Sequence, residues 1–184
     1  MNNCFIILAG GESQRFKSNI PKPYQLYKGK ALLLHSIDKT KNFNKFKKIV
    51  LVINKKHQAY IKKLKIKDVK IILGGKTRAE SAFKGLASIR GNKIKNVMIH
   101  DAARPNFSPQ LLRRLLKELK NNKCVIPAIK TTDSVKLKEL NNISNLKREN
   151  IYLTQTPQAF NYDELYKLQK KMGSEITDDA NLFI

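Results

Sequence analysis

Short apolar runs alternate with segments of helical periodicity between residues 4 and 128, and this alternation constrains the fold more than any other feature. Repeated strand–helix units predict a largely parallel sheet with helices on both faces. Leucines recur at helical spacing in 109–121 and predict a buried stripe. The expected strands are Cys4–Leu8, Lys48–Ile53, Val69–Leu73, Asn96–His100 and Cys124–Ala128, and the expected helices are Ala31–Thr40, Lys56–Leu64, Arg78–Ile89 and Pro109–Asn121.

The alternation stops between about residues 130 and 150, where the chain becomes polar and rich in turn residues. Lys130–Lys138 has the polarity of a strand, and turn-forming residues follow at 141–145. A hairpin of this kind is too polar to hold a core of its own. It is either a mobile surface loop or an arm that packs on a second subunit. With 184 residues and 41% apolar content, one domain covering residues 1–184 and carrying this arm is expected.

The first expected strand runs into a loop with the features of a phosphate site. Gly10 and Gly11 follow the apolar run Phe5–Leu8 and allow a ligand to approach the backbone closely. Arg15 and Lys22 then supply guanidinium and ammonium donors, which suit phosphate oxygens. The motif is neither a P-loop nor the G-x-G-x-x-G sequence of a dinucleotide fold. A plain strand-to-helix turn with solvated cations is the alternative, but the combination favours a nucleotide-phosphate site.

The segment that follows the fourth expected strand also carries chemistry, because ligands of open α/β sheets gather at the carboxyl ends of strands. The carboxylate of Asp101 can bind Mg²⁺, and Arg104 can engage a phosphate. A simple Asp–Arg pair in a capping loop explains the same residues equally well. His100 is expected to pack or hydrogen-bond in the interior and has no expected catalytic role.

The Gly-rich segment 74–81 follows the third expected strand and has two interpretations, which can hold together. Its backbone N–H groups and Ser81 could meet a base or a ribose. Alternatively, Thr77 is a plain N-cap and Glu80 completes a capping box.

Two later segments are less informative. Thr154–Phe160 is expected to leave the last clear strand for a loop, in which Thr156 could donate to an anion. Asp178 and Asp179 look like a capped helix start, which alone explains both acids.

The formal net charge of +23 at pH 7 raises the question of a nucleic-acid partner. Most of the cations are lysines spread over nearly every segment, and no nucleic-acid motif or aromatic-interleaved basic stripe occurs. We therefore expect a solvated surface and no nucleic-acid partner. No apolar run approaches a membrane span and no secretory signal is evident, so a cytoplasmic location is expected. Cys4 and Cys124 are expected to be small buried hydrophobes in a reducing compartment.

Together, the motifs resemble the 2-C-methyl-D-erythritol 4-phosphate cytidylyltransferase family of the non-mevalonate isoprenoid pathway. The resemblance extends from Ile6 to the C-terminus, and His-Asp-Ala-Ala-Arg-Pro at 100–105 is its most specific motif. The others, in order, are Leu-Ala-Gly-Gly, Gln-Arg-Phe, Pro-Lys, Gly-Gly-x-x-Arg-Ala-x-Ser, Asp-Ser-Val-Lys, Thr-Pro-Gln and Ile-Thr-Asp-Asp. The family implies a Rossmann-like three-layer α/β nucleotidyltransferase fold with a mostly parallel sheet and a protruding β-arm. It also implies a transferase that joins the sugar-alcohol phosphate to CTP and releases pyrophosphate.

The resemblance further implies roles for individual residues, Mg²⁺ as the cofactor, and a homodimer built through the arm at about 130–150. The implied catalytic residues are Arg15 and Lys22, which stabilise charge on the triphosphate, and Arg148, which reaches the substrate of the neighbouring subunit. The implied metal ligand is Asp101. The implied substrate contacts are Arg104, Ser134, Arg148 and Thr156. The implied nucleotide contacts are Leu8, Ala9, Gly10, Gly11, Arg15, Lys22, Gly75, Ser81, Asp101 and Ala102.

Three departures from the family pattern bear on activity. Lys76 stands where members often carry an acid, and Ser134 stands where a threonine is usual. The family pattern tolerates both substitutions. After Ile176–Ala180 the family continues with a strand, a lysine- and acid-bearing loop and a closing helix, whereas this sequence ends at Ile184. The resemblance therefore implies a truncated or degenerate chain of reduced stability. Transfer to another polyol phosphate, such as ribitol 5-phosphate, and nucleotide binding without turnover are the alternative functions.

Overall fold

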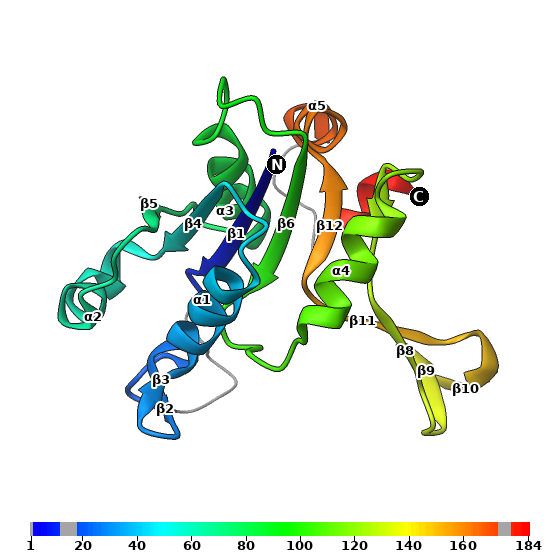
Figure 1. Cartoon of the computed structure of the whole chain (residues 1–184). Coiled ribbons are helices and arrows are strands. Elements are labelled where there is room, and N and C mark those ends of the chain that lie inside the picture. Colours follow the sequence, from blue (N-terminus) through cyan, green and yellow to red (C-terminus); the bar gives the residue numbers. More distant parts are fainter. Residues whose placement is uncertain (1, 12–17, 173–177) are drawn as a thin grey trace.

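A central twisted sheet lies between two layers of helices in the computed structural model, which describes residues 2–11, 18–172 and 178–184. Figure 1 shows this arrangement, with a two-stranded arm extending to the lower right. The order of strands in the sheet is β5 (Lys70–Leu73), β4 (Lys48–Ile53), β1 (Asn3–Ala9), β6 (Asn96–Asp101), β12 (Gln158–Asn161) and β7 (Cys124–Val125). The first four run parallel, and β12 runs antiparallel to both of its neighbours. The expected α/β fold with a mostly parallel sheet is confirmed.

Each face of the sheet packs against its own apolar layer. Side chains alternate along a strand, so Phe5 and Ile7 of β1 face one layer while Cys4 and Ile6 face the other. Burial on both faces explains why β1 is an unbroken apolar run. The first layer contains α1 (Leu32–Phe43), α2 (Gln58–Leu64) and α4 (Pro109–Glu118), and the second contains α3 (Arg78–Ala87), α5 (Tyr162–Met172) and the 3-10 helix η5 (Asp179–Phe183). The leucine stripe of α4 is buried in the first layer, as expected.

The C-terminal part of the sheet differs from the sequence expectation in two places. The expected strand Cys124–Ala128 is two short strands, β7 and β8 (Ala128–Lys130), which belong to different sheets. Pro127 lies between them and has no N–H to continue a ladder. The expected loop at 158–160 is instead strand β12, because it pairs on both sides with distant segments, β6 and β7. The helix α5 that follows it was not expected.

The segment 130–150 forms the expected hairpin, which we call the arm. Strands β9 (Val135–Glu139) and β10 (Asn142–Leu146) pair antiparallel. A second pair, β8 and β11 (Tyr152–Thr154), forms its base. Leu140 sits at the tip with a φ of 50° and is 95% exposed. The arm therefore presents an apolar side chain to solvent at its far end.

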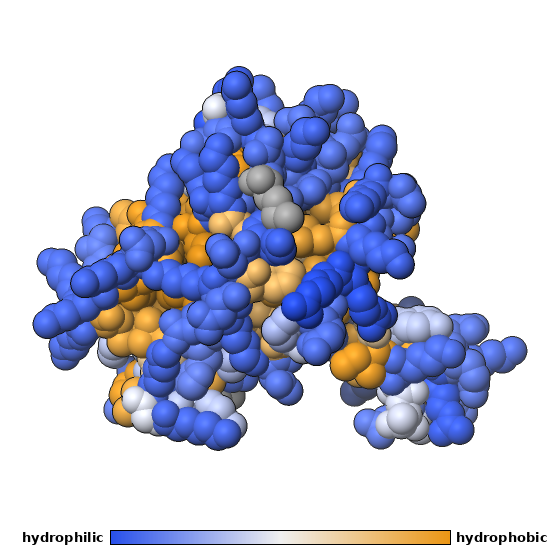
Figure 2. Space-filling model, in the orientation of Figure 1, coloured by the Kyte–Doolittle hydropathy of each residue, from blue (hydrophilic) through white to orange (hydrophobic). Residues whose placement is uncertain are grey.

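The surface in the view of Figure 2 is mostly hydrophilic, as the net charge of +23 leads one to expect. No helix in the described ranges is long and apolar enough to cross a membrane. Both cysteines are free thiols, Cys4 buried and Cys124 half-buried. Burial raises the pKa of the Cys4 thiol to about 12 and that of Cys124 to about 11, so both are neutral at pH 7.

The smaller elements complete the chain. The strands β2 (Leu26–Tyr27) and β3 (Lys30–Ala31) form a short hairpin before α1. The remaining 3-10 helices are η2 (Lys22–Tyr24), η3 (Lys55–His57) and η4 (Arg148–Asn150).

Candidate functional site

The loops that follow β1, β4, β5 and β6 meet at the carboxyl edge of the sheet. The backbone N–H of Ala102 donates to Leu8 O at 2.9 Å, and the N–H of Gly74 donates to the last carbonyl of β4 at 2.8 Å. The side-chain amide of Asn54 donates to Gly10 O at 3.3 Å. These hydrogen bonds bring the expected nucleotide-loop residues together at the position where open α/β sheets bind ligands.

The loop after β5 folds tightly around the first turn of α3. Ser81 Oγ accepts from Gly75 N at 3.1 Å, and Thr77 Oγ1 accepts from Glu80 N at 3.1 Å, which confirms Thr77 as the N-cap. Glu80 Oε2 accepts from the N–H of Lys76 at 2.7 Å, so the expected capping box is shifted by one residue. A Cβ on Gly75 would lie 2.3 Å from Glu80 Cβ. Close packing therefore requires glycine at this position.

Two guanidinium groups flank the carboxylate of Asp101. Arg78 Nε lies 3.5 Å from Asp101 Oδ1, and Arg104 Nε lies 3.3 Å from Asp101 Oδ2. Arg104 also donates from Nη1 to Gln155 Oε1 at 3.0 Å. The Asp–Arg pair expected from the sequence is thus present, together with a second arginine, Arg78, that was not expected at the site. Three charged groups at one strand end can bind both a cation and phosphate oxygens.

Arg78 also reaches a buried carboxylate from the C-terminal segment. Its Nη1 lies 2.6 Å from Oδ2 of Asp179, whose side chain is completely buried. Gln169 Nε2 donates to the other oxygen of Asp179 at 2.5 Å. Burial raises the pKa of the Asp179 carboxyl, and the nearby Arg78 offsets part of this effect. Burial lowers the pKa of Arg78, but the charges of Asp179 and Asp101 raise it overall.

The sequence interpretation of the two C-terminal acids was therefore wrong for one of them. Asp178 does cap η5, because its side chain accepts from Ala180 N at 3.0 Å. Asp179 is explained by the buried ion pair with Arg78 and not by capping. The two partners lie 101 positions apart in the sequence, so no local pattern could have paired them.

His100 packs and hydrogen-bonds in the interior, as expected. Its ring stands edge-on to Phe107 with centroids 4.7 Å apart. Its Nδ1 lies 2.9 Å from Thr156 Oγ1 and its Nε2 lies 3.4 Å from Ser36 Oγ. Burial lowers the pKa of His100 to about 3, so the ring is neutral at pH 7. Thr156 Oγ1 also accepts from Asp101 N at 3.4 Å, which places this expected substrate residue at the site.

Three expected residues of the described ranges, Lys22, Ser134 and Arg148, make none of the contacts above. Arg15 lies outside the described residues, and Lys22 is exposed in η2. Ser134 and Arg148 belong to the arm, which extends away from the sheet in Figure 1. Arg148 Nη1 donates to Thr132 O at 3.3 Å, a contact within the same arm. The structure therefore brings together the expected residues of the glycine loops and of the Asp101 loop, but it does not bring the arm residues to the site of their own chain.

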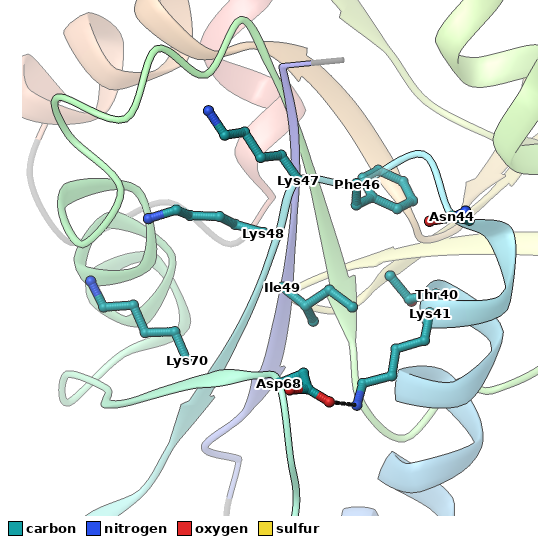
Figure 3. A pocket seen from close by; sticks show the side chains of 9 residues that line it. All are labelled: Thr40, Lys41, Asn44, Phe46, Lys47, Lys48, Ile49, Asp68 and Lys70. Carbon is teal, nitrogen blue, oxygen red and sulfur yellow. Dashed lines mark ion pairs between the residues drawn. The ribbon is translucent and has the colours of Figure 1, made fainter.

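A cavity of about 370 Å³ at the opposite edge of the sheet contains none of the expected site residues. In Figure 3, Lys41 points toward Asp68, 3.5 Å away, whereas Lys47, Lys48 and Lys70 point away from this pair, toward the left of the view. The cavity lies beside Asn44, the C-cap of α1. Open α/β sheets bind nucleotides at the carboxyl ends of their strands, whereas this cavity lies at the amino ends of β4 and β5. We therefore do not assign a nucleotide to this cavity.

A second cavity, of about 550 Å³, also contains none of the expected site residues. It lies between the β2–β3 hairpin, α1 and Pro105, the residue that follows Arg104. Its lining is Tyr27, Lys28, Leu32, His35, Lys39, Pro105 and Asn106. Lys39 Nζ donates to Pro105 O at 2.7 Å, which fixes this wall of the cavity beside Arg104.

The donor set at the strand end fits one mode of magnesium binding. Asp101 supplies a carboxylate that is about one-third exposed, with 32% of the side chain accessible. Mg²⁺ commonly takes one or two carboxylates and completes its coordination with water and substrate phosphates. Asp101 therefore fits a Mg²⁺ that shares its ligands with a bound triphosphate.

Comparison with known proteins decides between the families that such a site allows. The family model described as 2-C-methyl-D-erythritol 4-phosphate cytidylyltransferase matches residues 3–183. The chain belongs to this family. The resemblance inferred from the ordered motifs is thus confirmed.

Two curated relatives illustrate the match. A bifunctional enzyme IspD/IspF from Pelagibacter ubique is 70% identical over 184 residues, which cover 100% of this chain and 50% of the relative. A 2-C-methyl-D-erythritol 4-phosphate cytidylyltransferase from Caldicellulosiruptor bescii is 34% identical, covering 97% of this chain and 82% of the relative. The chain therefore spans about half the length of the bifunctional relative and most of the length of the other.

Solved structures agree on the fold. The bifunctional IspDF from Campylobacter jejuni superposes with a TM-score of 0.84 and 34% identity, covering 99% of this chain and 46% of that chain. The 4-diphosphocytidyl-2C-methyl-D-erythritol synthase from Anaerococcus prevotii gives a TM-score of 0.84 and 29% identity, covering 98% of this chain and 82% of that chain. The nucleotidyltransferase fold expected from the resemblance is confirmed.

Proposed function

We propose that this chain transfers the cytidylyl group of CTP to 2-C-methyl-D-erythritol 4-phosphate in isoprenoid biosynthesis. The products are 4-diphosphocytidyl-2-C-methyl-D-erythritol and pyrophosphate. One observation carries the proposal: in a chain of this family, Asp101 lies between Arg78 and Arg104 at the edge where the Gly10 and Gly75 loops meet. This arrangement offers cations to two phosphate groups at a site bounded by glycine loops.

The reaction requires the protein to position the two substrates and to stabilise the negative charge on the triphosphate. An oxygen of the acceptor phosphate attacks the α-phosphorus of CTP, the bond from that phosphorus to the bridging oxygen breaks, and pyrophosphate leaves with the bonding electrons. Arg15 and Lys22, by family resemblance, would stabilise the negative charge on the triphosphate. Arg104, held by Gln155, would orient the acceptor phosphate, and the cavity beside Pro105 offers room for the polyol.

Mg²⁺ is part of the proposal. Asp101 would hold it together with phosphate oxygens, and the ion would supply positive charge at the triphosphate. Arg78 and Arg104 would then balance the charge of Asp101 before the nucleotide binds. The remaining nucleotide contacts, at Leu8, Ala9, Gly11, Ser81 and Ala102, stay predictions from the family resemblance.

We further propose a homodimer formed through the arm. The side chains of Leu140 and Ile143 on the arm are 95% and 69% exposed. An isolated two-stranded hairpin is marginally stable in water and gains from packing on a partner. In such a dimer, Ser134 and Arg148 of the partner subunit would complete the acceptor side of each site. A cytoplasmic location is also inferred, since two free thiols suit a reducing compartment.

The function is tested by a pyrophosphate-release assay on the purified chain with Mg²⁺. We expect CTP to be preferred over UTP, GTP and ATP, and methylerythritol phosphate over ribitol 5-phosphate. Equal or reversed acceptor preference would reject the methylerythritol assignment in favour of another polyol phosphate. Tight CTP binding without product from either acceptor would instead indicate nucleotide binding without turnover.

A further inference from the structure

A buried acid lies behind the candidate site and is not used by the proposed reaction. Asp179 is fully buried, and Arg78 Nη1 and Gln169 Nε2 contact its two oxygens at 2.6 and 2.5 Å. Placing a carboxylate in the interior costs several kcal/mol unless charge and hydrogen bonds compensate. Both compensations come from specific side chains, so the position of this carboxylate is closely determined.

The guanidinium of Arg78 joins three parts of the site. Arg78 is the first residue of α3, three positions after the Gly74–Gly75 turn. Asp101 is the last residue of β6, and Asp179 is the first residue of η5. A single side chain therefore links the glycine loop, the candidate metal ligand and the C-terminal segment.

The two carboxylates compete for the same guanidinium. Asp179 holds Nη1 at 2.6 Å, whereas Asp101 lies 3.5 Å from Nε, beyond an ordinary hydrogen bond. Asp101 is also paired with Arg104 at 3.3 Å. If Arg78 moved fully onto Asp101, both carboxylate oxygens would be engaged by arginines. A divalent cation would then have to displace one of them, at the cost of a charge-assisted hydrogen bond.

We propose that Arg78 is a positioning residue of the nucleotide site, and that Asp179 is the buried counter-charge that holds Arg78 back from Asp101. Asp179 thereby leaves an oxygen of Asp101 accessible to a divalent cation that arrives with the nucleotide. Arg78 in turn keeps the Asp101 carboxylate in one orientation. This inference rests on the proposed function for the identity of the nucleotide, but it makes a separate prediction about cation binding.

The first variant separates the charge of Asp179 from its shape. Asp179→Asn keeps an oxygen acceptor for the guanidinium but removes the negative charge. Arg78 should then pair more strongly with Asp101. We expect the affinity for Mn²⁺ in the presence of CTP, measured by electron paramagnetic resonance, to fall about tenfold, a change of about 1.4 kcal/mol.

The second variant removes the whole buried pair. Breaking one partner of a buried ion pair is strongly destabilising, whereas replacing both by apolar residues of similar volume is often neutral. In Arg78→Met/Asp179→Leu no guanidinium can close on Asp101, so Mn²⁺ binding with CTP should equal or exceed that of the wild type. Turnover per folded molecule should still fall at least about tenfold because Asp101 loses its orientation. This variant also keeps the test decisive if Asp179→Asn does not fold.

Two controls separate positioning from general loss of structure. Leu112→Ala removes a buried side chain of α4 in the apolar layer on the other face of the sheet, and should lower stability with unchanged cation affinity per folded molecule. Glu164→Gln breaks the exposed pair with Lys123 (3.2 Å) at the start of α5, near the amino end of β6 and not the carboxyl end that carries Asp101. Glu164→Gln should change neither the Mn²⁺ affinity in the presence of CTP nor the turnover per folded molecule.

The outcomes distinguish this inference from the proposed function. If the wild type binds Mn²⁺ with CTP but makes no product, the proposed function fails while the binding comparison still tests Arg78 and Asp179. If Asp179→Asn, when folded, binds Mn²⁺ like the wild type, the counter-charge role is overturned. Wild-type turnover by the double variant overturns the positioning role of Arg78. A wild type that binds neither Mn²⁺ nor CTP overturns both proposals.

Discussion

Oγ1 of Thr156 lies 2.9 Å from Nδ1 of His100, and this contact fastens the turn before β12 to the buried end of β6. The same oxygen accepts from Asp101 N at 3.4 Å. At the other side of the ring, Ser36 Oγ lies 3.4 Å from Nε2 and donates to Ala102 O at 3.4 Å. A neutral ring with its proton on Nε2 satisfies all these groups at once, because each hydroxyl then donates once and accepts at least once. The backbone of the Asp101 loop is thus held by a buried uncharged ring.

Acidification should weaken the folded state through His100. Its pKa is lowered to about 3 in the folded chain, whereas an unfolded histidine titrates near 6.5. Between these values only the unfolded state binds the proton, so the stability contribution is complete above about pH 6.5 and is lost as the pH falls toward about 3. The free energy of unfolding should decline by up to about 1.4 kcal/mol per pH unit from this one group. Urea denaturation at pH 7 and pH 5 measures the decline.

His100→Asn provides the comparison, since it keeps an acceptor for Thr156 and cannot titrate in this range. It should be less stable than the wild type at pH 7 and show a flatter pH dependence. Asp179, with its raised pKa, acts in the opposite direction, but it is present in both proteins and cancels in the difference. Parallel pH dependences in the two proteins would contradict the assignment.

The sequence predicts the parts of this molecule that local patterns determine. The run Phe5–Leu8 is apolar on both faces because β1 is central, and Asp101 ends a strand in the expected position. The arm was predicted because the apolar periodicity of the sequence stops between about residues 130 and 150. Strand β12 was missed because its few residues are stabilised by pairing with β6 and β7, and not by any pattern of their own. The Arg78–Asp179 pair was missed for the same reason, since only the fold brings the two residues together.

Gly85→Ala should destabilise the chain although alanine favours helices. A Cβ at this position would lie 2.9 Å from Cγ2 of Ile6 and 3.4 Å from Cγ2 of Val52, both in the sheet beneath α3. Overpacking of this kind costs about 1–3 kcal/mol, and replacing a helical glycine returns about 0.5–1 kcal/mol. We therefore expect a net loss of up to about 2.5 kcal/mol in urea denaturation. Gly11→Ala is the control for stability alone, because no atom lies within 4 Å of the added carbon. A Gly85→Ala variant more stable than the wild type would show that α3 does not pack this closely on the sheet.

Gln155→Ala should weaken binding of the acceptor more than that of CTP. Gln155 Oε1 accepts from Arg104 Nη1 at 3.0 Å, and without it the guanidinium is free to turn further toward Asp101. Loss of one such hydrogen bond is worth about 1 kcal/mol, so the KM for methylerythritol phosphate should rise about fivefold. The KM for CTP should stay within about twofold of the wild-type value, which corresponds to a difference of about 0.4 kcal/mol.

Steady-state kinetics with each substrate varied in turn measure both constants. Asn122→Ala removes an exposed side-chain bond to Glu118 O at the end of α4 and should leave both unchanged. An equal rise in both KM values after Gln155→Ala would mean that Arg104 does not serve the acceptor side.

Removing the apolar tip of the arm should dissociate the proposed dimer without unfolding the chain. Leu140 has a φ of 50°, a conformation that asparagine adopts more readily than leucine. Leu140→Asn/Ile143→Thr therefore suits the turn and retains a β-branched residue in β10, while it removes two exposed apolar side chains. Each contributes about 1.5–3 kcal/mol if it is buried at an interface. The dimer dissociation constant should rise at least tenfold, about 1.4 kcal/mol, in analytical ultracentrifugation.

Lys138→Thr is the matched control for the arm, because Lys138 is paired directly with Ile143 across the hairpin. It changes the same strand pair without removing an apolar group, so the dimer should persist. In the Leu140→Asn/Ile143→Thr variant, turnover should fall along with dimer content while CTP binding is retained, since the nucleotide-side residues belong to one chain. A wild-type chain that stays monomeric at high concentration would refute the dimer. Full turnover by a monomeric variant would show that Ser134 and Arg148 do not act on the site of a partner subunit.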